Sequence, residues 1–211
     1  MINKNYLSIY AKSFNWAGFF LPKKTYLDCS LLYDFCRTVD NIADEDGILE
    51  VKKKKLLNFR NNFNNRDYSS AIIKNMWSLI DEFKISTKVV NDLIDGAESD
   101  LKEKVKINSQ KELLIYSYRV AGTVGLMMAK ILNVKNRDAL KSAIDLGIAM
   151  QLTNISRDIV EDANNNRFYI SSDFNSIKET LKLAEQFYKS SFSSINKIPI
   201  SFRFAILVAR R

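Results

Sequence analysis

Residues 143–155 read Ala-Ile-Asp-Leu-Gly-Ile-Ala-Met-Gln-Leu-Thr-Asn-Ile, and this stretch decides the fold class of the 211-residue chain. It is apolar on nearly all sides of a helix, which predicts a buried, central helix over residues 136–163. Polar side chains nevertheless recur in its second half, within a stripe of about 80° at ~100° per residue. They are Gln151, Asn154, Asp158 and Asp162. Two buried carboxylates on one stripe are costly, so something cationic must face them.

A second polar stripe lies in a helix predicted over residues 25–45. Its members fall within about 60° of one another by the same geometry. They are Tyr33, Arg37, Asp40 and Asp44. Two facing Asp-x-x-x-Asp pairs would form a chamber of carboxylates, and oxygen ligands without His or Cys favour magnesium over zinc or copper. Magnesium held in this way would bridge the protein to a diphosphate. The alternative interpretation is that both stripes are solvated surfaces.

The rest of the chain reads as helical. It contains 6 Gly and 2 Pro, and so few helix breakers favour long helices. Further helices are predicted at 3–13, 48–64, 69–83, 87–104, 110–132 and 176–195. Ser109 and Glu112 are spaced as a capping box, Thr25 is a candidate N-cap and Asn133 a candidate C-cap, while residues 167–170 read as a short extended connector. The sequence therefore predicts an all-α, single-domain helical bundle.

Composition narrows the classes of function. The chain has no histidine, which removes the Ser-His-Asp triad and most zinc chemistry. Its formal charge of +8 would suit nucleic acid, an acidic membrane surface or a polyanionic substrate. The lysines are scattered, however, and the one dense run, Lys52 to Lys55, has no aromatic residues between its members, so no nucleic-acid partner is expected. No apolar signal core and no run of ~18 apolar residues is present, which predicts a cytoplasmic protein.

Five segments resemble, in order, the signatures of squalene and phytoene synthases. Residues 33–45 (Tyr-Asp-Phe-Cys-Arg-Thr-Val-Asp-Asn-Ile-Ala-Asp-Glu) are similar to the first aspartate-rich signature, and residues 151–163 resemble the second. The other matching segments are Ala11-Lys12-Ser13-Phe14 with Leu21-Pro22 (N-terminal segment), residues 118–125 (central Val-Ala-Gly helix) and residues 167–169 (the Arg-x-Tyr after the second signature). The resemblance implies an isoprenoid-synthase-type helical bundle with a central cavity.

The resemblance also implies a reaction, the head-to-head condensation of two prenyl diphosphates. One allylic diphosphate ionises, and the double bond of the second attacks to give a cyclopropylcarbinyl diphosphate, which ionises again and rearranges. The preferred interpretation is a phytoene synthase of carotenoid biosynthesis that uses two geranylgeranyl diphosphates. One alternative is a squalene or hydroxysqualene synthase that uses farnesyl diphosphate, with NADPH only if it is of the squalene type. The other is an inactive fragment or interaction subunit of the same fold.

Carried over residue by residue, the resemblance assigns roles. Magnesium, with manganese as an alternative, would be held by Asp40, Asp44, Asn154, Asp158 and Asp162. Substrate would be bound by Lys12, Ser13, Arg37, Gln151, Asn154, Arg157 and Tyr169. The catalytic residues would be Tyr33, Arg37 and Tyr116. Arg157 lies about 120° from the middle of the Asp158 stripe, so helix geometry supports its role less directly than that of Arg37, which lies on its own stripe. Peripheral association with the inner membrane face would help an apolar product to leave.

The chain departs from the family pattern at two places. Ala11 stands where the family usually has a hydroxyl residue, which removes one expected phosphate donor. Family members also continue for several further helices beyond the apolar run at residues 201–211. Residues 1–211 are therefore expected to form one squalene/phytoene synthase-like domain from which the C-terminal helices are missing.

Overall fold

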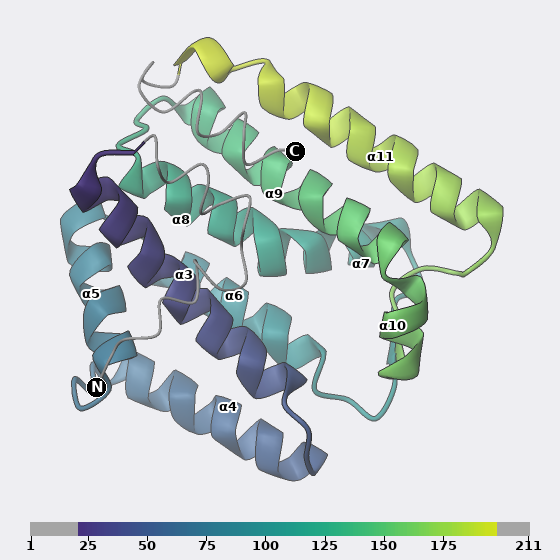
Figure 1. Ribbon diagram of the computed structural model, residues 1–211, viewed down its shortest axis with the longest axis horizontal. Helices are drawn as coiled ribbons and strands as arrows, with labels where there is room; N and C mark the ends of the chain where they lie inside the picture. Colours follow the sequence, from purple (N-terminus) through teal and green to yellow (C-terminus); the bar gives the residue numbers. More distant parts are fainter. Residues whose placement is uncertain (1–20, 198–211) are drawn as a thin grey trace.

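The computed structural model describes residues 21–197, and within them the fold is helical (Figure 1). Lys12, Ser13, the helix predicted at 3–13 and the run at 201–211 lie outside the described residues. The helices are α3 (Lys23–Asp44), α4 (Leu49–Asn64), α5 (Ala71–Phe83), α6 (Thr87–Ser99), α7 (Gln110–Ser117), α8 (Thr123–Ile131), α9 (Arg137–Arg157), α10 (Ile159–Asn164) and α11 (Phe174–Phe192), with a π-helical segment η1 (Tyr118–Gly122) and a 3₁₀ turn η2 (Ile195–Lys197). The strands β1 (Val105–Lys106) and β2 (Arg167–Phe168) form a short parallel pair. The all-α prediction is confirmed.

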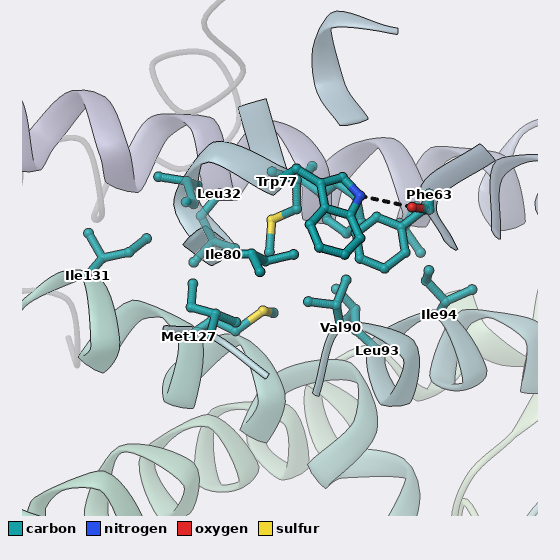
Figure 2. Close-up of a cluster of buried hydrophobic side chains, with 14 of the residues drawn as sticks. Leu32, Phe63, Trp77, Ile80, Val90, Leu93, Ile94, Met127 and Ile131 are labelled. Atoms are coloured by element: carbon teal, nitrogen blue, oxygen red, sulfur yellow. Dashed lines mark hydrogen bonds between the residues drawn. The ribbon is translucent and has the colours of Figure 1, made fainter. Parts of the chain in front are cut away.

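One hydrophobic core joins α3, α4, α5, α6 and α8 (Figure 2). The Phe63 ring, which is fully buried, stacks on Trp77 with ring centroids 5.2 Å apart. The indole N–H of Trp77 donates to the carbonyl oxygen of Phe63 over 2.8 Å, so the one polar atom of this buried ring has a partner. On α3 the buried side chains are Phe35 and Val39 among others, which leaves Asp40 outside this core.

A second hydrophobic core lies among α7, α9, α11 and the two strands. Helix α9 runs beside α11 and also packs against α8 and η1, which gives it the central position that its apolar sequence predicts (Figure 1). Leu152 and Ile155 of α9 are buried in this core together with Tyr116 of α7 and Tyr169, which follows β2. The core therefore fixes the segments that carry several candidate site residues.

The single helix predicted over 136–163 is wrong, because it breaks at Asp158. Helix α9 ends at Arg157 and α10 begins at Ile159, and the α10 axis turns away from that of α9 (Figure 1). The Asp158 backbone has φ −100° and ψ 18°, and Arg157 contacts the Asp158 carboxylate through both its Nε and its Nη2. Side chains of adjacent residues point about 100° apart on a regular helix, so a contact of this kind accompanies a distorted backbone.

The helix predicted at 87–104 is shorter than expected, while the one predicted at 110–132 is helical over 110–131 but contains a π-helical segment. Helix α6 ends at Ser99, and the chain then pairs as β1 with β2, so that Val105 lies opposite Arg167. The second stretch is divided by η1, which is the kind of π-helical insertion found often at functional sites. The extended connector predicted at 167–170 is confirmed in its first half, as β2.

Of the residues predicted to begin or end helices, some are confirmed and one is not. The capping box is confirmed, because the Ser109 hydroxyl accepts from the Glu112 N–H and the Glu112 carboxylate accepts from the Asn108 N–H. Asn133 has the left-handed φ of 56° just after α8, as a helix-ending residue does. Thr25 is not an N-cap: α3 begins two residues earlier, directly after Pro22, whose ring restricts φ to the range that suits a helix start. No helix among residues 21–197 is both long and apolar enough to cross a membrane.

Glycines let α9 approach η1 and α8 at backbone distance. A Cβ on Gly147 would lie 2.3 Å from the carbonyl oxygen of Ala121, and one on Gly125 would lie 2.2 Å from that of Ala143. These distances are far below van der Waals contact, and the atoms met belong to the backbone. Close helix packing therefore explains both residues without reference to a ligand.

We expect Gly147→Ala to lower the free energy of unfolding by about 1–3 kcal/mol, as overpacking does in tight cores. The gain of about 1 kcal/mol in helix propensity offsets only part of this cost. Urea unfolding followed by circular dichroism measures the change. Lys141→Ala, at an exposed position of the same helix, is the control and should be close to neutral. Equal stability of the Gly147 variant and the wild type would contradict the close approach.

Candidate active site

The polar stripe of α3 lies on the side of the helix that faces away from the hydrophobic core. Arg37 Nη1 and Asp40 Oδ2 are 3.5 Å apart, and 58% of the Asp40 side chain is exposed. Surrounding protein atoms and the carboxylate of Asp44 together raise the pKa of Asp40 to about 6, with Arg37 opposing them. Burial also raises the pKa of Tyr33, which Arg37 lowers in turn. The stripe is thus a crowded group of charges that is still open to water.

Arg167 connects the end of α3 to β2. Its Nη1 lies 2.8 Å from Asp44 Oδ1, its Nη2 donates to the Ala43 carbonyl over 3.4 Å, and its side chain is 16% exposed. Burial alone would lower the pKa of this guanidinium, but Asp100, Tyr169 and Asp44 outweigh burial and raise it. Arg167 belongs to the Arg-x-Tyr segment that the sequence singled out, yet the sequence assigned it no role of its own.

The second aspartate pair lies at the break between α9 and α10. Arg157 Nε and Nη2 are each 2.7 Å from an oxygen of Asp158, while 68% of the Arg157 side chain is exposed. Arg157 therefore reaches the first aspartate of this pair. The pKa of Asp162 is raised to about 6 by burial and by Asp158. Asn154 and Gln151, about one and two turns before Asp158 on α9, are half-buried.

Sequence reasoning missed Asp100, which lies at the C-terminal end of α6. The hydroxyl oxygens of Tyr116 and Tyr169 each lie within hydrogen-bond distance, 2.8 Å, of one of its carboxyl oxygens. The two tyrosine rings stack with centroids 4.6 Å apart. Nothing in the local pattern identifies Asp100, because it stands in the charged run 98–104 and its two partners lie 16 and 69 residues away.

Asp100 and Arg167 link the two aspartate pairs electrostatically. Both act on the pKa of Asp40, where the ionised form of Asp100 raises it and Arg167 lowers it, and both act in the same directions on Asp162. The structure thus brings the α3 pair and the α9–α10 pair into one electrostatic environment. Of the candidate residues in the described ranges, Tyr116 and Tyr169 join this environment through Asp100.

The donor set suits a hard divalent cation. Within residues 21–197 no three His, Cys, Asp or Glu side chains are grouped closely enough to hold a metal ion. Magnesium, however, usually takes only one or two protein carboxylates and completes its octahedron with water and substrate phosphate oxygens. Burial and, second to it, the neighbouring carboxylate raise the pKa values of Asp40 and Asp162, and a bound cation would favour the ionised form of both.

A hollow elsewhere on the surface has no part in this arrangement. Its volume is about 430 Å³, and it is lined by Gln110, Lys111, Leu114, Ile115 and Tyr118. None of these residues is a carboxylate of the two pairs.

Comparison with known proteins agrees with these signatures. The family model described as squalene/phytoene synthase matches residues 7–175. The phytoene synthase of Cereibacter sphaeroides is 34% identical over 173 residues, covering 77% of this chain and 48% of the relative. The 15-cis-phytoene synthase of Pantoea ananas is 26% identical, covering 97% of this chain and 77% of the relative. The chain spans about half the length of the first relative and of the Rhodobacter capsulatus phytoene synthase, of which it covers 49%.

Solved structures show the same fold. A dehydrosqualene synthase crystallised in complex with a ligand superposes with a TM-score of 0.78 and 27% identity, over 97% of this chain and 80% of that one. The squalene synthase HpnC from Alicyclobacillus acidocaldarius has a TM-score of 0.81 at 16% identity, covers 96% of this chain and 85% of its own, and supports the fold alone. The match over residues 7–175, the ordered signatures and the shared architecture lead to one conclusion: this chain belongs to the squalene/phytoene synthase family.

Proposed function

We propose that this chain carries the active-site residues of a magnesium-dependent prenyltransferase that joins two geranylgeranyl diphosphates head to head into phytoene. The observation that carries the proposal is the shared environment of two Asp-x-x-x-Asp pairs around Asp100 and Arg167. The names of the relatives support the choice of product, because those at 26–34% identity are phytoene synthases.

The charged residues of the site divide into two proposed roles. Asp40, Asp44, Asn154, Asp158 and Asp162 would hold magnesium, which supplies neutralisation of the diphosphate leaving group when bound. Arg37 and Arg157 would bind diphosphate oxygens through their planar guanidinium forks, with Lys12 and Ser13 as further contacts. Arg167, held on Asp44, keeps a positive charge beside the carboxylates when no substrate is present.

The aromatic residues would serve the hydrocarbon part of the substrate. The stacked rings of Tyr116 and Tyr169 offer aromatic surface, which stabilises a nearby allylic carbocation. Tyr33 and Gln151 would line the same region. Ionisation of one diphosphate and attack by the double bond of the second then give the cyclopropylcarbinyl diphosphate described above.

A second candidate function uses the shorter substrate. The solved dehydrosqualene synthase, at 27% identity, favours farnesyl diphosphate as an alternative, and NADPH would be required only for a squalene product. In either case an apolar hydrocarbon leaves the site, so we also propose peripheral association with the inner face of a membrane.

Incubation with labelled geranylgeranyl or farnesyl diphosphate, each with and without NADPH, tests the proposal. The chain should be assayed alone and fused to the C-terminal part of the C. sphaeroides relative, because it spans about half of that protein. We expect phytoene with magnesium and none with a chelator. A product from farnesyl diphosphate alone would overturn the substrate length. No product in either form would overturn the function and favour an inactive fragment or interaction subunit.

A further inference from the structure

Three oxygen-bearing side chains form a closed ring of contacts where α6, α7 and the segment after β2 meet. Tyr116 Oη lies 2.8 Å from Asp100 Oδ2, Tyr169 Oη lies 2.8 Å from Asp100 Oδ1, and the two phenol oxygens lie 2.9 Å apart. All three separations are those of O–H···O hydrogen bonds. Tyr116 is 9% and Tyr169 5% exposed, so water does not readily replace the contact between the two phenols.

The number of protons in this ring is fixed by its chemistry. Each phenol carries one hydroxyl proton, and an ionised carboxylate carries none and can only accept. Two protons make two hydrogen bonds, whereas the ring has three contacts. With an ionised Asp100, either one carboxylate oxygen lacks a donor or the two phenol oxygens meet at 2.9 Å with no proton between them. A buried oxygen pair without a proton is costly.

We propose that Asp100 carries the third proton at neutral pH and acts as a positioning residue, closing a ring of three hydrogen bonds that holds the phenols of Tyr116 and Tyr169. The carboxylic acid donates to one phenol, that phenol donates to the other, and the second phenol donates back to the carbonyl oxygen of Asp100. Each phenol oxygen then both donates and accepts a hydrogen bond within the ring. Of the two carboxyl oxygens of Asp100, one donates and the other accepts.

The surroundings of the ring raise the pKa of Asp100 above its ordinary value. Burial is the largest influence on Asp100 and raises its pKa, and Asp44 adds to the effect. Arg167 opposes it, as do the two tyrosine hydroxyls. Arg167 is already paired with Asp44 at 2.8 Å and is not within hydrogen-bond distance of Asp100 in any contact of the described residues. The positive charge of Arg167 therefore acts on Asp44 as well as on Asp100.

The ring has a consequence for the site, and this step rests on the proposed function. Tyr116 lies near the end of α7, next to the π-helical segment η1, and Tyr169 follows a strand of only two residues. Asp100 joins them, so it sets where the aromatic surface offered to a carbocation lies.

Infrared difference spectroscopy on the full chain tests the proton directly and needs no activity. At pH 7 the wild type minus Asp100→Asn spectrum should contain the carbonyl band of a protonated carboxylic acid. Asp145→Asn is the matched control, because Asp145 is a buried acid that accepts from the Ser190 hydroxyl, outside the ring. That control should leave the band in place. If the wild type shows no such band, or loses it only in the Asp145 variant, Asp100 is ionised and the proposal is overturned.

Turnover of an asparagine variant also distinguishes the contribution of the Asp100 proton from that of a negative charge at Asp100. The asparagine amide donates to one phenol and accepts from the other, as the protonated acid does, so Asp100→Asn should retain most of the turnover that Asp100→Ala loses. Asp100→Ala opens the ring and should lower kcat about 100-fold with a smaller effect on KM, as displaced catalytic groups do. A loss in the asparagine variant as large as in the alanine variant would show that the charge matters, and would contradict the ring. A protein that shows the band but makes no product would overturn the proposed function and leave the ring standing.

Discussion

Replacing Asp40 or Asp158 with asparagine should lower turnover by about 100- to 1,000-fold, as loss of a group that stabilises leaving-group charge does. Each change removes one carboxylate from the proposed magnesium ligands and leaves a side chain of nearly the same shape. Steady-state turnover of labelled substrate at several magnesium concentrations is the measurement. Asp46→Asn, at an exposed acid just beyond α3, is the control and should leave turnover unchanged. Near-normal turnover of the Asp40 variant at limiting magnesium would rule out its role as a ligand.

The same carboxylates should make the metal-free protein more stable at mildly acidic pH. The folded-state pKa values of Asp40 and Asp162 are raised to about 6 from 3.8, so the folded protein binds more protons than the unfolded chain between these values. The free energy of unfolding therefore falls as pH rises from about 4 to about 6, as far as these two groups determine it. Asp40→Asn should remove part of this slope and raise the melting temperature at pH 7 in a chelator. A slope unchanged by the substitution would contradict the raised pKa of Asp40.

Arg167→Leu should destabilise the chain by about 1–3 kcal/mol, less than the loss of a fully buried ion pair because Asp44 is 46% exposed. The substitution leaves Asp44 and Asp100 without the guanidinium that acts on both. We expect turnover to fall as well, since the site loses a cation. Chemical unfolding at fixed pH measures the stability, and Lys189→Leu, which breaks the exposed pair with Glu185, is a control expected to cost less than about 1 kcal/mol.

A double substitution separates the charge effect from a packing effect. If the cost of Arg167→Leu comes from uncompensated carboxylates, adding Asp44→Asn should recover part of it, and the two changes will not be additive. Strict additivity would show that the Arg167 side chain contributes through packing alone. In that case its link between α3 and β2 would be incidental.

Most of the helices could be predicted from the sequence because they bury an apolar face, and that pattern is local. The capping box at Ser109 and the extended segment at Arg167 were likewise predictable from neighbouring residues. The break at Asp158 was not, because periodicity continues through it and the backbone N–H groups of Asp158 and Asp162 still bond four residues back. A change of helix direction needs no change in the apolar pattern.

The residues of the candidate site also divide into those that the sequence could identify and those that it could not. Asp40 and Asp162 could be identified because a carboxylate on a largely apolar helix conflicts with burial. Asp100 could not, because it lies in a run of charged residues where a carboxylate is ordinary. Its importance comes only from Tyr116 and Tyr169, which tertiary contacts bring to it. Such residues become visible when the chain is folded.

The pairing of β1 with β2 decides which side chains of the segment after α10 face the aspartates. The number of residues between α10 and β2 therefore influences the charge of the site. Arg167 and Tyr169 are two residues apart and so point to the same side of the extended segment, while Phe168 points to the other, where Lys104 lies over its ring. Deleting one residue from the turn at 164–166 would shift the register by one and exchange the two sides. Phe168 and Ile170 would then face the aspartates, and an apolar wall would replace the cation and the phenol. Among relatives, the number of residues in this turn should therefore vary less than its composition.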